Sequence, residues 1–241
     1  MSVDYRHFSP ESLARYLDHT QLKAQATRED LEKLCAEAVS YGVKAIAVNP
    51  AQVRFCAPLL KKPEGQRAAG GTEVLICATA GFPLGQSSIA VKTLEALEAI
   101  GEGAAEIDYV VNITELKAKN YGYVEREMAE IVELCREQGA HSKVIFENCY
   151  LSDAEKAELC RIALAVGPDF IKTSTGFGTG GALLEDLRLM KKLVGERIKI
   201  KAAGGIRNLD TALEMIGAGA ERIGTSAATA IVDELKERLR D

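Results

Sequence analysis

Amphipathic, helix-like stretches alternate with short apolar runs along the whole chain. Six times such a stretch passes through a glycine into an apolar run, in "SYGVKAIAVN", "GEGAAEIDYVVN", "EQGAHSKVIFEN", "LAVGPDFIKTS", "VGERIKIKAAGG" and "GAGAERIGTSA". Glycine can end a helix in the left-handed conformation without a steric penalty, so each of these glycines predicts a helix end before a strand. Together with "RYLDHT" and "TEVLICATAG", the pattern predicts eight strands with a helix between each pair.

Two stretches carry the signals of helix starts. "TRED" and "SDAE" place a hydroxyl residue, Thr27 or Ser152, three residues before a carboxylate, which is the spacing of a capping box.

The alternation of helices and strands forces parallel strands joined by crossovers, and the nearly apolar strands fit a sheet covered on both faces.

The number of units and the length of the chain indicate the architecture. Eight βα units in 241 residues favour a closed (β/α)8 barrel, which takes about 250 residues, over an open doubly wound sheet, which stays possible. No linker, low-complexity tract or charge block divides the chain, so we predict a single α/β domain over residues 1–241.

Composition limits the classes of binding partner and the cellular compartment that we expect for the protein. The formal charge of -5 argues against a nucleic-acid partner, because proteins that bind the phosphate backbone usually have a surplus of basic residues. The six cysteines form no C-x-x-C pair, which indicates reduced thiols rather than a disulfide framework. No signal peptide opens the chain, and no apolar run approaches the roughly 18 residues of a membrane span. We therefore predict a cytoplasmic protein that acts on a small molecule, without a membrane partner.

Three reactive side chains mark the predicted strand ends, where a barrel of this kind places its active site. The sixth strand ends in Lys172, the seventh ends in Lys201, and the fourth contains Asp108. Neighbouring strands lie about 4.8 Å apart, so two inward lysines at the same height should be close. Two ammonium groups about 5 Å apart repel by roughly 3 kcal/mol at an effective dielectric near 20, which lowers one pKa, and burial lowers it further. A neutral amine attacks a carbonyl to form a Schiff base.

Simpler interpretations of these residues stay open. A lone lysine at a strand end is usually a solvated stem, and Lys199, one pleat nearer the start of its strand than Lys201, is assigned no role. Asp108 is either a structural counter-ion or a partner of a lysine or an active-site water, because a carboxylate inside an apolar strand needs a partner.

Glycine-rich turns after the seventh and eighth strands suggest a phosphate site. Gly204 and Gly205 follow "KAA", and Gly224 precedes Thr225 and Ser226. Loops at these positions of a barrel often bind phosphate through backbone amides and a helix N-terminus. Arg207 adds a charge there or pairs with a surface carboxylate, and a glycine pair alone also fits an ordinary turn.

Metal and nucleotide chemistry find little support. His7, His19 and His141 lie far apart and form no H-x-H or H-E-x-x-H pattern. "STGFGTGG" lacks both the Walker lysine and the dinucleotide fingerprint, so we expect no metal and no cofactor. In "LDHT", Asp18 and Thr20 are candidates for substrate contact at the barrel mouth, although Asp18 and His19 also fit a local hydrogen-bond network.

The ordered motifs "LDHTQL", "AVNP", "AGFPLG", "EIDYVVN", "KVIFE", "IKTSTGFG", "KAAGGIR" and "GTSA" closely resemble those of deoxyribose-phosphate aldolases. The resemblance covers the chain from about residue 15 to about residue 230. It implies a class I aldolase on a (β/α)8 barrel that reversibly cleaves 2-deoxy-D-ribose 5-phosphate to acetaldehyde and D-glyceraldehyde 3-phosphate without a metal. It also implies a homodimer or homotetramer.

The resemblance assigns roles to individual residues of this chain. It implies that Lys172 forms the Schiff base, that Lys201 is its companion, and that Asp108 relays protons through a water. The residues it places near the phosphate and the sugar hydroxyls are Thr175, Gly176, Gly204, Gly205, Gly224 and Ser226. The chain departs from many relatives by having Ala227 in place of a second serine, and it ends in "KERLRD" without the tyrosine that some relatives carry. Rival interpretations are a phosphosugar isomerase or epimerase, and a sensor without catalysis.

Overall fold

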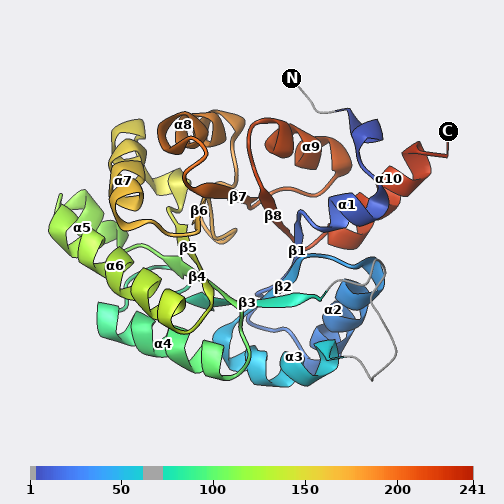
Figure 1. The fold of residues 1–241 in the computed structure, drawn as a ribbon, viewed down its shortest axis with the longest axis horizontal. Helices are drawn as coiled ribbons and strands as arrows, with labels where there is room; N and C mark the ends of the chain where they lie inside the picture. The colour runs from blue at the N-terminus through green and yellow to red at the C-terminus, as the bar shows by residue number, and fades with distance from the viewer. Residues whose placement is uncertain (1–3, 62–72, 241) are drawn as a thin grey trace.

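A computed structural model of the chain describes residues 4–61 and 73–240 (Figure 1). Eight parallel strands close into a barrel in the order β1 to β8, each paired with its neighbours in sequence, and β8 pairs with β1. The predicted closed barrel is therefore confirmed, and the open sheet is wrong. The strands are β1 Leu17–Gln21, β2 Ala45–Val48, β3 Leu75–Ala80, β4 Glu106–Val110, β5 His141–Ile145, β6 Phe170–Lys172, β7 Lys199–Ala203 and β8 Arg222–Thr225.

Helices form a ring around the barrel (Figure 1). The α-helices are α1 Pro10–Ala14, α2 Arg28–Tyr41, α3 Val53–Leu60, α4 Ile89–Gly101, α5 Ile113–Lys117, α6 Tyr121–Glu137, α7 Asp153–Val166, α8 Leu184–Val194, α9 Leu209–Gly217 and α10 Ala228–Arg238. Among the described residues, the short 3-10 helices are η1 Tyr5–His7, η2 Pro50–Gln52 and η4 Asn148–Tyr150. None of the described helices combines the length and apolar character needed to cross a membrane.

The local signals predicted from the sequence are present at α2 and α7. Thr27 and Ser152 each accept a hydrogen bond from the backbone of a residue that returns one to the cap, so both capping boxes form. Gly42 and Gly167 end the same two helices with φ of 66° and 80°. This left-handed conformation is disfavoured for residues with a Cβ, which explains glycine at both positions.

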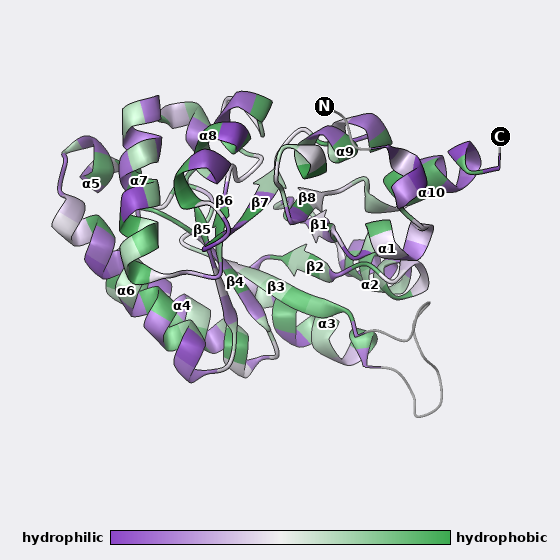
Figure 2. Cartoon of the chain, turned by 45° about the horizontal axis from the view of Figure 1, so that its top comes forward, coloured by the Kyte–Doolittle hydropathy of each residue, from purple (hydrophilic) through white to green (hydrophobic). Residues whose placement is uncertain are grey.

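The two faces of the barrel strands differ in chemistry. Side chains that point outward, such as Ile107, Ile171 and Ile200, are fully buried against the helices in one continuous apolar core, and helix faces toward the barrel are largely hydrophobic (Figure 2). Side chains that point inward include small residues and buried charges, among them Asp108 and Lys143. The prediction of strands that are apolar on both faces is therefore wrong for the barrel interior, where opposite charges neutralise one another. That residues 1–241 form one domain stays a prediction.

Candidate active site

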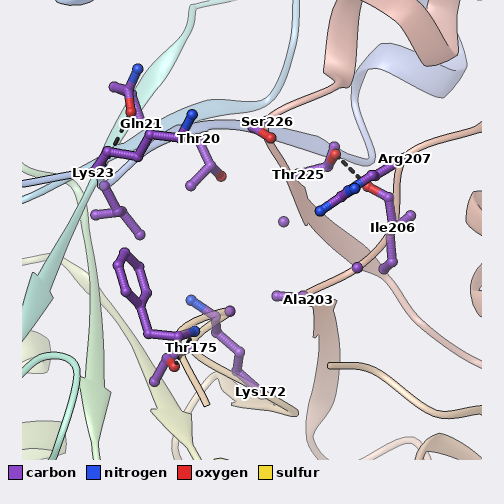
Figure 3. A pocket seen from close by; sticks show the side chains of 16 residues that line it. Thr20, Gln21, Lys23, Lys172, Thr175, Ala203, Ile206, Arg207, Thr225 and Ser226 are labelled. Carbon is purple, nitrogen blue, oxygen red and sulfur yellow. Dashed lines mark hydrogen bonds between the residues drawn. The ribbon is translucent and has the colours of Figure 1, made fainter. Parts of the chain in front are cut away.

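A pocket of about 300 Å³ opens at the carboxyl ends of β1, β6, β7 and β8 (Figure 3). Nine residues predicted for catalysis or binding line it, namely Thr20, Lys172, Thr175, Gly176, Gly204, Gly205, Arg207, Gly224 and Ser226. Seven further lining residues were not predicted as site residues, although Thr225 was noted in the turn after the eighth strand, namely Gln21, Leu22, Lys23, Phe177, Ala203, Ile206 and Thr225. Asp18, Asp108 and Lys201 lie deeper in the barrel and do not line this pocket.

The three predicted catalytic side chains meet at the floor of the pocket. Lys172 and Lys201 are register partners on β6 and β7. Both ammonium groups donate to one oxygen of Asp108, Lys172 Nζ at 2.7 Å and Lys201 Nζ at 2.8 Å from Oδ2. The two nitrogens are therefore no further apart than these two hydrogen-bond lengths together. Of the three residues, only Lys172 reaches the pocket, with 3% of its surface exposed.

The two lysines have opposite pKa shifts. Burial lowers the pKa of Lys172 and is the largest cause; Asp108 opposes this effect, and the charge of Lys201 adds to it. Burial would also lower the pKa of Lys201, but Asp108 and Asp18 raise it above the ordinary value. Both predicted causes, repulsion from Lys201 and loss of water, therefore contribute to the Lys172 shift, and loss of water is the larger of the two. Lys201 keeps its charge, and Lys172 is the amine that more readily becomes neutral.

Asp108 stays ionised despite complete burial. Burial would raise its pKa, but the ammonium groups of Lys143, Lys172 and Lys201 together hold it well below its usual range. Its second oxygen, Oδ1, lies 3.0 Å from Lys143 Nζ and accepts a hydrogen bond from the Cys77 thiol at 2.9 Å. Burial and the neighbouring Asp108 raise the pKa of Cys77 to about 12, so this thiol remains protonated and serves as a donor.

A second layer of buried charges lies below Asp108 and Lys201. One carboxylate oxygen of Asp18, Oδ2, lies 2.5 Å from Lys201 Nζ. The other, Oδ1, accepts a hydrogen bond from Arg222 Nη1 at 2.8 Å. Glu106 accepts from Lys143 at 2.6 Å and from Arg222 at 3.0 Å. Asp18, predicted to contact the substrate, is fully buried in this layer, so it acts as a counter-ion of Lys201 below the pocket.

Sequence reasoning missed Lys143, Glu106 and Arg222. The sequence does contain a signal for them. Successive side chains of a strand point to opposite faces, and each of these charges stands at an inward position, in "EID", "HSKVI" and "RIGT". Burial would raise the pKa of Glu106, but the charges and hydrogen bonds of Lys143 and Arg222 outweigh this effect and lower it to about 2. Lys199, which was assigned no role, lies at the opposite end of β7, exposed, with its Nζ 5.6 Å from the centre of the Phe170 ring.

The glycines of the pocket wall are required by geometry. Gly204 and Gly205 have φ of 89° and 81°, and a Cβ on Gly204 would lie 3.0 Å from the Cα of Gly181. A Cβ on Gly224 would lie 3.0 Å from the Cβ of Ala203 and 3.2 Å from Lys201 Cε. Bare backbone therefore faces the pocket on this side, where a ligand can approach the peptide N–H groups.

The start of α10 adds a second anion-binding feature beside these glycines. Ala227, at its N-cap, provides no side-chain hydrogen bond to the first turn, and its own N–H donates to Thr225 Oγ1 at 2.9 Å. Exposed Ser226 and exposed Arg207 lie on the same wall (Figure 3). An uncapped helix N-terminus with a nearby guanidinium favours a phosphate group.

The histidines do not converge. His19 is buried but turns away from the pocket, with Nε2 2.8 Å from Glu37 Oε2, while His141 pairs with Asp169 at the other end of the barrel. Within the described ranges, Asp18, Cys77 and Glu106 are close enough together to share a metal ion. Lys201 and Arg222 pair with Asp18, and Lys143 and Arg222 pair with Glu106, so protein cations already occupy this cluster.

Comparison with known proteins shows one consistent similarity. Residues 13–232 match the model of the DeoC/LacD family of aldolases. The deoxyribose-phosphate aldolase of Lactobacillus acidophilus is 50% identical over 97% of this chain and 95% of its own length. Among solved structures, a putative deoxyribose-phosphate aldolase from Coccidioides immitis has a TM-score of 0.88 at 33% identity, covering 98% of this chain and 88% of that one. A deoxyribose phosphate aldolase from Aeropyrum pernix, described as tetrameric, has a TM-score of 0.83 at 33% identity, covering 95% and 93%.

Proposed function

The chain belongs to the DeoC/LacD family of aldolases, and from this premise we propose that it cleaves 2-deoxy-D-ribose 5-phosphate reversibly to acetaldehyde and D-glyceraldehyde 3-phosphate. One observation carries the proposal: the amine of Lys172 is almost fully buried, has a lowered pKa and opens onto the pocket. An amine of this kind retains a neutral fraction that attacks an aldehyde carbonyl. The chemistry proposed below uses only side chains of the protein, without a metal or cofactor.

Schiff-base formation is the first stage. Lys172 Nζ attacks the C1 aldehyde of the open-chain sugar to form a carbinolamine, which loses water and becomes an iminium ion. Asp108, hydrogen-bonded to that nitrogen, accepts the proton that the amine releases and returns it, through water, to the departing hydroxyl. Because its pKa is held well below the usual range, Asp108 is present as the carboxylate at neutral pH and is able to accept.

Carbon–carbon cleavage is the second stage. The C3 hydroxyl gives its proton, through water, to Asp108, the electrons of the C2–C3 bond flow to the iminium nitrogen, and an enamine forms while glyceraldehyde 3-phosphate leaves. Protonation of the enamine at C2 and hydrolysis of the resulting iminium release acetaldehyde and restore the Lys172 amine. Lys201 keeps its charge throughout, which disfavours protonation of Lys172 and holds Asp108 in place through their shared hydrogen bonds.

We place the phosphate end of the substrate against the wall formed by the turns after β7 and β8. Gly204, Gly205 and Gly224 present open backbone there, and Ser226 and Arg207 add a hydroxyl and a charge. This assignment is supported by the uncapped N-terminus of α10 on the same wall. It leaves Thr20, Thr175 and the Lys172 amine to face the sugar carbons.

Two further features belong to the proposal. The protein works in the cytoplasm, in keeping with six free cysteines, five of them buried. It forms a homodimer or homotetramer, supported by the tetrameric relative and by an apolar stripe on α4, where Val91, Leu94 and Leu97 are 53%, 64% and 42% exposed. An exposed stripe at helical spacing fits a second copy of the same chain.

The rival enzyme class lacks support at this site. A phosphosugar isomerase or epimerase needs a carboxylate or histidine base against the substrate, and within the described residues the pocket is lined by neither. A sensor without catalysis has no use for an amine whose pKa is lowered by burial.

Reductive trapping tests the proposal at its central residue. The protein is incubated with acetaldehyde and borohydride, and its peptides are mapped by mass spectrometry. We expect an N-ethyl group on Lys172, its loss in Lys172→Ala, and its retention in Lys199→Ala, which removes an exposed lysine at the other end of the barrel. An unmodified Lys172, or ethylation confined to surface lysines, refutes the aldolase mechanism; an adduct without turnover of deoxyribose 5-phosphate favours the sensor.

A further inference from the structure

Glu147, between β5 and η4, has an unusual backbone for a buried charged residue. Its φ is 45°, in the left-handed region that residues with a Cβ avoid, and only 2% of its surface is exposed. The other described non-glycine residue with positive φ is Lys119, which is solvent-exposed and ends a turn. A strained backbone that holds a buried carboxylate needs a compensating interaction, and such strain concentrates at functional sites.

Both oxygens of the Glu147 carboxylate accept hydrogen bonds from one pocket residue, Thr175. The Thr175 N–H donates to Oε1 at 3.1 Å, and the Thr175 hydroxyl donates to Oε2. The same hydroxyl accepts a hydrogen bond from the Phe177 N–H at 3.0 Å. Glu147 therefore orients both the backbone and the side chain of the segment that follows Lys172 and forms one corner of the pocket (Figure 3).

The surrounding contacts leave this arrangement little freedom. The backbone of the Glu147 segment is tied to the strand that carries the amine, because Phe146 N donates to Lys172 O and Asn148 N donates to Thr173 O, both at 2.9 Å. On its other side, a Cβ added to Gly178 would lie 3.1 Å from the Glu147 carboxyl carbon. The position of the carboxylate is therefore fixed from two directions.

The hydrogen-bond inventory of the Thr175 hydroxyl follows from these contacts. A hydroxyl has one proton and two lone pairs, and an ionised carboxylate only accepts. The proton of Thr175 is given to Glu147, and one lone pair is taken by the Phe177 N–H. One lone pair remains for a ligand, so Thr175 is able to accept a hydrogen bond in the pocket but not to donate one.

We infer that Glu147 is a positioning residue that fixes the hydrogen-bond polarity of Thr175, so that this corner selects a ligand hydroxyl, as donor, over an unprotonated acceptor. The inference rests on the proposed function for the identity of the ligand. It narrows the role of Thr175 to a sugar hydroxyl, because the oxygens of an ionised phosphate offer no proton and the buried Glu147 charge repels them. The phosphate is thereby directed to the glycine wall formed by the turns after β7 and β8.

The substitution Glu147→Gln separates polarity from shape. It keeps the size of the side chain but replaces one oxygen by an NH2 group. The Thr175 N–H only donates, so the amide oxygen must face it and the NH2 group must face the Thr175 hydroxyl. The hydroxyl then accepts from both the amide and the Phe177 N–H, and its own proton turns toward the ligand. Glu147→Gln therefore inverts the polarity of Thr175 without removing any group from the pocket.

The experiment compares two acceptor aldehydes in the aldol direction, each with acetaldehyde. One is D-glyceraldehyde 3-phosphate, and the other is its analogue with fluorine in place of the C2 hydroxyl, which cannot donate. For the wild-type protein we expect kcat/KM to favour the hydroxyl compound by about tenfold, the discrimination of one hydrogen bond. For Glu147→Gln we expect the ratio to fall below about threefold, since the fluorine no longer meets an acceptor-only group.

Controls distinguish positioning from a structural role. Like Glu147, Glu155 accepts hydrogen bonds from the hydroxyl and the backbone N–H of one residue, Ser152, but this pair lies at the start of α7, outside the pocket. Glu155→Gln should therefore leave the ratio of the two kcat/KM values unchanged. Glu147→Asn suits the left-handed backbone but is too short to reach Thr175, and should lower the ratio as Glu147→Gln does. Thr175→Val should also lower it, which covers the case in which the Glu147 variants fail to fold.

A binding measurement keeps the inference separate from turnover. Glycerol 3-phosphate and its 2-fluoro analogue do not react, and their Kd values can be measured by calorimetry with each variant. A hydroxyl preference in Kd that Glu147→Gln removes supports the inference even when deoxyribose 5-phosphate is not cleaved, an outcome that would overturn the proposed function alone. A ratio that is the same in wild type and Glu147→Gln, by kinetics and by binding, overturns the inference.

Discussion

Replacing Lys201 by leucine tests how the amine of Lys172 is kept reactive. Both ammonium groups donate to Asp108 Oδ2, at 2.7 and 2.8 Å, so the two nitrogens are at most the sum of these distances, about 5.5 Å, apart. At an effective dielectric near 20, that repulsion is roughly 3 kcal/mol. Removing it also frees Asp108 to stabilise the charged form of Lys172 more strongly, so both changes act in the same direction and favour the protonated amine.

The expected result is a loss of rate that alkaline pH restores in part. A change of roughly 3 kcal/mol corresponds to about a hundredfold smaller fraction of neutral amine at neutral pH. Because the pKa of Lys172 is lowered in the native protein, activity that requires the neutral amine is lost as pH falls, and Lys201→Leu should move this acid limb to higher pH. Burial, the larger cause of the shift, is unchanged, so some activity should remain.

The assay is kcat/KM for deoxyribose 5-phosphate measured from pH 6 to 10 with Lys201→Leu, Lys201→Arg and Lys199→Met. The arginine variant keeps the charge and should keep the position of the acid limb even where its rate is lower. Lys199→Met removes an exposed lysine of the same strand and should match the wild type. An acid limb that does not move in Lys201→Leu refutes the argument that the charge of Lys201 assists Lys172.

Three other predictions concern stability, phosphate binding and assembly. The pKa of Glu106 is about 2 in the native protein against an ordinary 4.5. Its contribution to the free energy of unfolding, roughly 3 kcal/mol, is therefore complete above about pH 4.5 and is lost as pH falls toward 2. Denaturant titrations of Glu106→Gln at several pH values should lack this loss of stability. Gly204→Ala introduces a Cβ at positive φ and 3.0 Å from Gly181, and should raise KM for deoxyribose 5-phosphate at least tenfold but change KM for unphosphorylated deoxyribose less. Leu94→Glu, on the exposed α4 stripe, should lower the mass found by light scattering while leaving the circular dichroism spectrum unchanged; an unchanged mass would place the interface elsewhere.

The barrel and the mouth of its pocket were accessible from the sequence because local rules determine them. Glycine before six of the eight apolar runs, capping boxes at Thr27 and Ser152, and the alternation of helices with strands predict eight parallel strands, which the structure confirms. Once strands are placed, barrel geometry brings their carboxyl ends together, so Lys172, Gly204 and Gly224 were predicted to share one site and do so. The family resemblance is confirmed by the match over residues 13–232.

The charge network of the interior was not accessible in the same way. Asp18 and Lys201 lie far apart in the sequence, as do Glu106 and Arg222, and nothing local indicates which acid meets which base. The inward positions were visible as alternation, but the partners depend on register and on the diameter of the closed barrel. The cause of the Lys172 pKa shift depended on them as well, because burial is a property of the whole packed site.

Sequence alone therefore determined the fold class, the family and the strand ends that carry the reactive groups, since these depend on periodicity, turn chemistry and motifs along one stretch of chain. Tertiary structure alone decided which side chains are dry and which charges are neighbours. It moved Asp18 from the pocket into a counter-ion role, made loss of water the main cause of the Lys172 shift, and turned Glu147 toward Thr175. Electrostatic energies depend on distance and on exclusion of water, and both quantities exist only once the barrel has closed.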